Sequence, residues 1–246
     1  ANAYIARKLG EGNRESANKG AKTAIVMALF AWAIMAVMAF TLSRPFVQAF
    51  VNDGNATDVN YVVEKGTMYL TIYMAASGGV TLDIVSARIL QATGNMKVPM
   101  ISQLIGAVTN IVLDALFIMV FKMGVFGAIL ATVIGQWFAA SFDLAFFIFK
   151  KQDVSISLKG FRFNAHYFAR IAKIGLPALV MNAMSSVVTI ILNVMLRSYT
   201  NGITVLSAYF KVQSFIFMPV FGLMQGTMPI PVSYTHLRAH ETRRQR

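Results

Sequence analysis

Six apolar runs, each long enough to cross a lipid bilayer as a helix, constrain this chain more than any other feature. They lie at about residues 22–50, 66–92, 98–122, 124–149, 174–198 and 203–230. A hydrocarbon core about 30 Å thick needs roughly 20 apolar residues of helix. Within lipid, a helix satisfies its backbone polar groups internally. The sequence therefore predicts an all-α, polytopic helical membrane protein.

The basic residues are distributed unevenly between the loops that join these runs. If the runs alternate across the membrane, thirteen basic residues fall on one side and four on the other, a positive-inside pattern. We therefore expect residues 1–21 and 150–173 to face the cytoplasm, in the cell membrane or the inner membrane of a Gram-negative cell. The formal net charge of +12 then reflects topology and the lipid bilayer, and no nucleic-acid partner is expected. The thirteen are Arg7, Lys8, Arg14, Lys19, Lys22, Arg88, Lys97, Lys150, Lys151, Lys159, Arg162, Arg170 and Lys173, and the four are Arg44, Lys65, Lys122 and Arg197.

One long connection divides the chain. Residues 1–149 hold four runs, residues 150–173 form the connection, and residues 174–230 hold two runs. Apolar and basic residues alternate loosely along the connection, which is typical of an amphipathic segment at the membrane surface. We interpret it as a cytoplasmic linker, with a regulatory or gating role as the alternative.

The last sixteen residues, 231–246, differ in composition from everything before them. They contain four of the 22 basic residues and two of the three histidines, without an apolar period or helix caps. One back-translation of Pro231 to Thr242 resembles an end adapter used in DNA library preparation. We interpret this segment as a sequencing artefact and leave it out of the fold. The alternative is a basic tail at the membrane surface.

Asp114 places a carboxylate inside the third apolar run. Asn110 lies four residues earlier, on the same helix face. The turn into the next run is centred near Met123, nine residues after Asp114, and Thr132 lies nine residues beyond that turn. Equal counts in an antiparallel hairpin place Thr132 and Asp114 at one depth. Carboxylate, amide and hydroxyl oxygens suit a hard cation such as Na⁺, for which Asp114 would be the charged ligand. A proton held by Asp114 for coupling is one alternative, and a purely structural hydrogen bond is another.

Three further charged residues lie inside apolar runs. Asp143 lies toward the cytoplasmic end of its run, and Asp83 has Arg88 nearby as a candidate partner, so we interpret both carboxyl groups as structural. Lys211 could meet an anionic substrate, reach the membrane surface, or pair with a helix outside this sequence.

Several motifs resemble those of the multidrug and toxic compound extrusion (MATE) transporters. In chain order they are "NAYIARKLGEGN", "ILQATGN", "GAVTNIVLDALFI", "GVFGAILATVIGQ", "IGLPA" and "SFIFMPVFGLMQG". The resemblance covers Ala1 to Ile230. Family members have twelve helices in two six-helix lobes, so it implies a partial two-lobe bundle, a fragment that spans family helices three to eight.

The resemblance implies a secondary antiporter that exports organic, often cationic, compounds in exchange for H⁺ or Na⁺, with no cofactor. Asn110, Asp114 and Thr132 match the ion site that one branch places in its first lobe, together with an Asp from a family helix that this sequence lacks. Another branch uses a second-lobe Glu, and Ser185 stands at that position here. This departure leaves a second ion site in doubt, while Asn182, Ser185, Asn193 and Lys211 are candidates for the lining of a substrate cavity.

Three other functions are weighed against antiport. A flippase for lipid-linked oligosaccharides belongs to the same superfamily, but Lys211 is the only obvious intramembrane cation to receive such a substrate. A structural membrane protein would not need the polar residues at matched depth. An enzyme is not expected, because the sequence has no Cys, no HExxH and no GxSxG motif.

Overall fold

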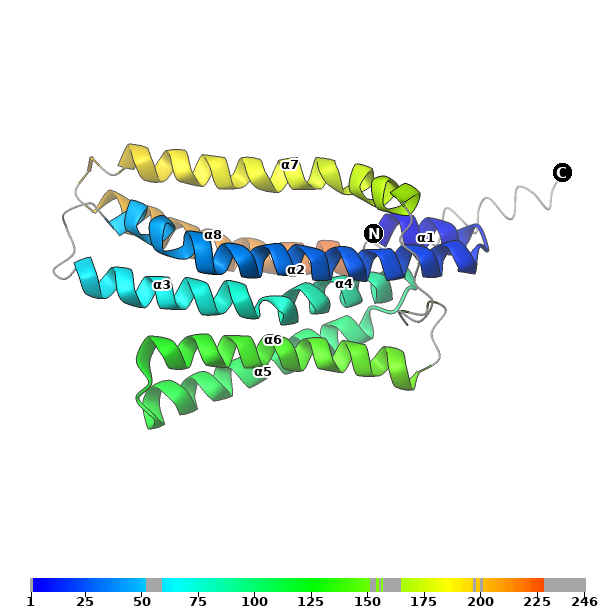
Figure 1. The fold of residues 1–246 in the computed structure, drawn as a ribbon, viewed down its shortest axis with the longest axis horizontal. Coiled ribbons are helices and arrows are strands. Elements are labelled where there is room, and N and C mark those ends of the chain that lie inside the picture. The colour runs from blue at the N-terminus through cyan, green and yellow to red at the C-terminus, as the bar shows by residue number, and fades with distance from the viewer. Residues whose placement is uncertain are drawn as a thin grey trace. The chain divides into compact units, whose positions relative to one another are not determined.

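The computed structural model describes residues 2–51, 59–150, 154, 156, 165–196, 198–199 and 201–227. Every regular element in these ranges is a helix, and the chain divides into two compact units, Ala1–Phe168 and Ala169–Arg246. Half of the predicted linker, residues 151–153, 155 and 157–164, and the whole predicted artefact, residues 231–246, lie outside the described residues. The elements, shown in Figure 1, are α1 (Asn2–Gly10), α2 (Arg14–Val51), α3 (Val59–Ala76), α4 (Gly78–Ala92), α5 (Lys97–Asp114), the π-helix η1 (Ala115–Val120), α6 (Gly124–Phe149), α7 (Ala165–Leu196) and α8 (Gly202–Thr227).

The described helices confirm the predicted multi-pass membrane protein. Five are long and apolar enough to span a bilayer: α2, α5 with η1, α6, α7 and α8. The α3 and α4 helices together form a sixth candidate span, bent by 42° at the break between them. The start of α7 differs from the predicted run, because the helix begins at Ala165 and includes residues 165–173 of the predicted linker. These nine residues contain neither Gly nor Pro, so nothing in them interrupts the helix.

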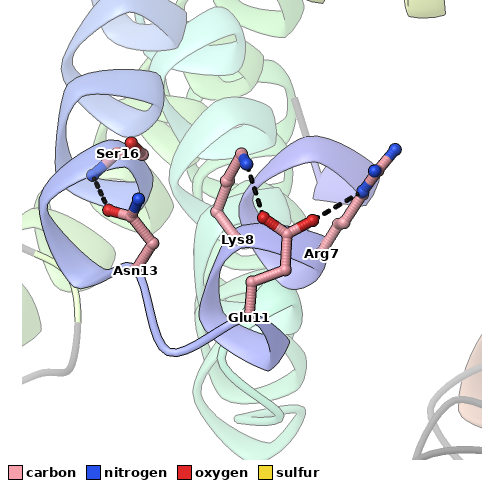
Figure 2. A network of polar contacts seen from close by, with 5 residues as sticks. All are labelled: Arg7, Lys8, Glu11, Asn13 and Ser16. Carbon is pink, nitrogen blue, oxygen red and sulfur yellow. Dashed lines mark hydrogen bonds and ion pairs between the residues drawn. The ribbon is translucent and has the colours of Figure 1, made fainter.

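Two turns of the first unit are built by the same dipeptide, Gly-Asn. Gly12 and Gly94 have φ of +73° and +83°, a left-handed conformation that glycine adopts without steric cost. Each ends a helix with the paired backbone hydrogen bonds of a Schellman motif. The asparagine side chain that follows then accepts a hydrogen bond from a backbone N–H three residues later. The Ser16 N–H donates to Asn13 Oδ1 at 2.9 Å (Figure 2), and the Val98 N–H donates to Asn95 Oδ1 at 3.3 Å. The dipeptide therefore closes one helix and satisfies a free N–H in the first turn of the next.

Two tryptophans hold the break between α3 and α4. The indole N–H of Trp32, on α2, donates to the carbonyl of Ala75 at 2.9 Å, and that of Trp137, on α6, donates to the carbonyl of Ala76 at 3.2 Å. These carbonyls lie in the last turn of α3, where intrahelical partners are lacking. Gly78 leaves room for the Trp32 ring, because a Cβ there would lie 2.8 Å from it. The break is thus an organised part of the first unit.

The α5 and α6 helices form an antiparallel hairpin, visible side by side in Figure 1. The α-helical hydrogen bonding of α5 ends at Asp114, and the chain continues as the π-helix η1 up to the turn. Gly106 and Gly135 let the backbones touch: a Cβ on Gly135 would lie 2.8 Å from the Gly106 carbonyl oxygen. Close approach through small residues is how membrane helices pack without a hydrophobic driving force.

The described helices of the second unit, α7 and α8, have little contact with each other. In the most apolar 18-residue window of α7 no residue is buried, and in that of α8 only 6% are, against 33% for α6. Pro177 and Pro219 lie inside these two helices. Their apolar side chains are therefore free to face lipid or other helices.

Candidate functional site

The hairpin brings Asn110 and Thr132 together. The Asn110 side-chain amide donates to Thr132 Oγ1 at 3.3 Å, and that hydroxyl donates to the Ala128 carbonyl at 2.9 Å. Both side chains are half-buried. The amide nitrogen therefore faces α6, and the Asn110 carbonyl oxygen keeps its capacity to accept a hydrogen bond or a cation. The Thr132 hydroxyl oxygen has a lone pair left for the same use.

Asp114 lies one helical turn beyond Asn110 on α5. Its side chain is half-buried, and its Oδ1 is buried without a hydrogen-bond partner among the described residues. Asp114 is also the last residue of α5, directly before η1. Short π-helical segments occur frequently at functional sites. An unsatisfied carboxylate oxygen at such a junction is a place for a proton or a cation.

The hairpin also bears on the residue count that placed Thr132 level with Asp114. The hydrogen bond in the structure joins Thr132 to Asn110, four residues before Asp114 on the same helix. Counting from the turn therefore found the helix and the approximate level from which Thr132 reaches α5.

The glycine contact is what allows this hydrogen bond. Gly106 and Gly135 each lie about one helical turn from the bonded residue on their own helix. A Cβ at Gly135 would also lie 3.2 Å from the Cβ of Asn110. A larger residue at position 135 would therefore push α5 and α6 apart at the level of the site.

A polar residue that the sequence did not single out lies next to the site. Gln136 follows Thr132 by four residues on α6, and so shares its face of the helix. Its Oε1 is buried without a partner in the described part of the chain. Side-chain amides are common helix-packing residues in membranes, so the sequence alone carried no signal for it.

The two carboxyl groups interpreted as structural meet in a second cluster. Asp83 and Asp143 interact with each other and with Ser102 of α5. Arg88, the partner suggested for Asp83, donates to the side chain of Gln91 at 2.9 Å. No local pattern revealed this cluster, since Asp83 and Asp143 are sixty residues apart and meet only because α4 packs on α6.

The candidate cavity residues of the second unit bond to their own helix. The Asn182 amide donates to the Ala178 carbonyl at 2.8 Å, and the Ser185 hydroxyl is 3.4 Å from the Met181 carbonyl. Asn182, Ser185 and Lys211 are exposed, and Asn193 is half-buried. Nothing among the described residues draws these four side chains into one site.

No group of three or more His, Cys, Asp or Glu side chains suited to a metal ion occurs in the described ranges. Any cation at the hairpin would therefore be held by Asp114 as its one charged ligand there, with neutral amide and hydroxyl oxygens around it. Such a set suits a monovalent ion or a proton better than a divalent metal.

Comparisons with known proteins agree on one family. Residues 1–116 match the MatE family model. The multidrug export protein MepA of Staphylococcus aureus (strain NCTC 8325 / PS 47) is 30% identical over 163 residues, which make up 66% of this chain and 36% of that protein. The chain thus spans about a third of the length of this curated relative.

Solved transporter structures share the fold. The inward-facing conformation of a multidrug resistance MATE family transporter of the MOP superfamily matches with a TM-score of 0.78 at 22% identity, covering 90% of this chain and 50% of that one. The outward-facing conformation of a transporter of the same description matches with a TM-score of 0.78 at 23% identity, covering 96% and 52%. The chain therefore has the fold of about half of such a transporter.

Proposed function

This chain belongs to the MATE family, as its motifs predicted, and from that premise we propose that it forms part of a secondary antiporter. The complete protein exports organic cations, drugs or toxins, in exchange for H⁺ or Na⁺ across the cell membrane. Two features support the proposal: the multidrug export function named for the relative, and the polar site inside the α5–α6 hairpin. Residues 1–21 and 150–173 face the cytoplasm in this proposal.

The coupling role rests on one observation: Oδ1 of Asp114 is buried and has no hydrogen-bond partner within the described ranges. A charged side chain near the bilayer centre costs at least about 2.5 kcal/mol. Because Asn110 makes its hydrogen bond to Thr132 rather than to Asp114, nothing described offsets that cost. Binding of H⁺ or Na⁺ to Asp114 neutralises the charge, and the free oxygens of Asn110 and Thr132 complete the site.

Exchange follows if ion and substrate favour different conformations. A ligand shifts a conformational equilibrium only by its difference in affinity for the two states. We propose that the protein with an ion bound to the hairpin favours one conformation, and that the protein with the organic cation bound favours the other. Binding of either ligand then promotes release of the other ligand. Asn182, Ser185, Asn193 and Lys211 are proposed to line the substrate cavity in the second lobe, together with helices outside this sequence.

The test is transport by the full-length gene product in proteoliposomes, with a fluorescent lipophilic cation as substrate. Asp114→Asn replaces the titratable oxygen by an amide of the same size, so we expect gradient-driven transport to be lost while expression and thermal stability stay at the wild-type level. Glu64→Gln is the matched control, because Glu64 is an exposed carboxylate on α3.

Two results decide the assignment. Transport by Asp114→Asn that still responds to a proton or sodium gradient would remove Asp114 from the coupling site. Imposing a pH gradient and a sodium gradient separately on the wild-type protein then identifies the ion that drives transport.

A further inference from the structure

Two carboxyl groups meet in the first unit, away from Asp114. Asp83 comes from α4 and Asp143 from α6, and both interact with Ser102 of α5. Asp143 and Ser102 are fully buried, with 0% of their surface exposed, whereas Asp83 is half-buried. Three helices therefore enclose a pair of acids of which one has no access to water.

Three of the four carboxyl oxygens of this pair have no hydrogen-bond partner within the described part of the chain. Both carboxyl oxygens of Asp143 and Oδ1 of Asp83 are buried without a partner among the described residues. Ser102 does not supply a proton to them, because its hydroxyl donates to the Pro99 carbonyl at 2.9 Å. Ser86, three residues after Asp83 on the same side of α4, is also fully buried, and its Oγ is unpartnered. Buried polar atoms normally have partners, so these oxygens indicate a missing occupant.

Basic side chains do not provide that occupant. Within the described part of the chain, the groups that act on the two carboxyls are Ser102 and the other acid of the pair. Two adjacent carboxylates in low-dielectric surroundings cannot both remain charged without a cation. The other titratable groups on α4 and on the helices packed against α4 and α6 are Tyr4, Arg7 and Lys8 on α1; Arg14, Glu15, Lys19, Lys22 and Arg44 on α2; Tyr61, Glu64, Lys65, Tyr69 and Tyr73 on α3; Arg88 on α4; and Lys97 and Asp114 on α5.

We propose that Asp83 and Asp143 bind a proton between them, as a second protonation site of the first lobe. Asp143 carries the proton, because it is fully buried and its charge would be the more costly one. Asp83 keeps the negative charge, because its half-buried side chain is less enclosed than that of Asp143. The Asp143 O–H then donates to the Asp83 carboxylate, which gives both groups a hydrogen bond.

This site is separate from the one at Asp114. Asp143 and Thr132 are eleven residues apart on α6, about 16 Å along the axis. Between them lies the close contact of Gly106 with Gly135. The proposed proton site therefore does not depend on which ion binds to Asp114.

Infrared spectroscopy of the full chain in lipid nanodiscs tests the proposal, with ¹³C-carboxyl-labelled aspartate to separate Asp from Glu signals. At neutral pH we expect the C=O stretch of a protonated aspartic acid. Asp143→Asn should remove it, because Asp83 alone can ionise in contact with water. Asp83→Asn should keep the band but move it to higher frequency, because an amide accepts a weaker hydrogen bond than a carboxylate. Glu64→Gln should leave the band unchanged.

Several results would overturn the proposal. These are the absence of a protonated-aspartate band in the wild-type chain, its survival in Asp143→Asn, an unmoved band in Asp83→Asn, or its loss when Na⁺ replaces choline at constant pH. The last result would assign the pair to a cation. If Asp143→Asn fails to fold, the frequency shift in Asp83→Asn decides alone. A band that only Asp114→Asn removes belongs to the other site, so this test is distinct from the transport assay.

Discussion

The α5–α6 hairpin and the α7 helix use the same kinds of polar residue in different ways. In the hairpin, the Asn110 amide donates to a hydroxyl on the neighbouring helix, Thr132. On α7, the Asn182 amide donates to its own helix, to the carbonyl of Ala178. An asparagine in a membrane helix thus forms a site only where a second helix comes close enough to replace the bond to its own backbone.

Glycine decides how close the second helix comes. Gly106 and Gly135 bring α5 and α6 into backbone contact, whereas a Cβ at Gly175 of α7 or Gly222 of α8 would meet nothing within 4 Å. From this contrast we infer that the candidate ion site of the first unit depends on close helix packing as much as on its polar residues.

The largest effect on stability should come from adding a side chain at the contact between Gly106 and Gly135. Gly135→Ala places a Cβ 2.8 Å from a backbone oxygen, and overpacking of this kind costs about 1–3 kcal/mol. Gly222→Ala adds a methyl group in open space, and should be neutral or stabilise the helix by up to about 1 kcal/mol. Unfolding of both variants in denaturing detergent measures the difference. Equal stability of the two would show that the hairpin does not depend on this contact.

A smaller effect should follow from removing the hydrogen bond across the hairpin. Thr132→Val keeps the shape of the side chain but loses the hydroxyl, and side-chain hydrogen bonds between membrane helices average about 0.6 kcal/mol. Ser185→Ala removes a hydroxyl that faces its own backbone, so its effect should stay within about 0.5 kcal/mol. The same unfolding titration compares the two. A larger loss of stability in Ser185→Ala than in Thr132→Val would contradict the contrast drawn between the hairpin and α7.

The smallest expected effect is a pH dependence of the stability of the turn between α1 and α2, which lies outside the membrane-spanning helices. Hydrogen bonds from Lys8 and Arg7 lower the pKa of Glu11 below its usual value of 4.5 (Figure 2). A group whose pKa is lowered by folding stabilises the folded state above its unfolded pKa, and this contribution is lost as the pH falls through the folded pKa. We expect hydrogen exchange in α1 to accelerate in that acidic range, and Glu11→Gln to abolish this dependence. An unchanged pH profile in the variant would assign it to another group.

The sequence predicted the elements that depend on local pattern. Run lengths identified the membrane helices, and the spacing of Asn110 and Asp114 placed both on one helix face. Thr132 was found by counting across the hairpin, and its hydroxyl accepts the hydrogen bond from Asn110.

Features that depend on contacts between distant helices were not predicted. The pairing of Asp83 with Asp143 requires the packing of α4 on α6, and neither residue carries a neighbouring motif. The break at Ser77 was also missed, because residues 66–92 read as one apolar run. At this break Gly78 lies against the Trp32 ring, a contact that the sequence of the run does not reveal.

The two indole groups at that break also make the protein its own optical probe. Trp32 and Trp137 are the only tryptophans among the 246 residues, and each donates its N–H to one of two successive carbonyls. Indole emission responds to the polarity and hydrogen bonding around the ring, so the unlabelled chain reports on one location only. A change in the bend between α3 and α4 would therefore alter both emitters together.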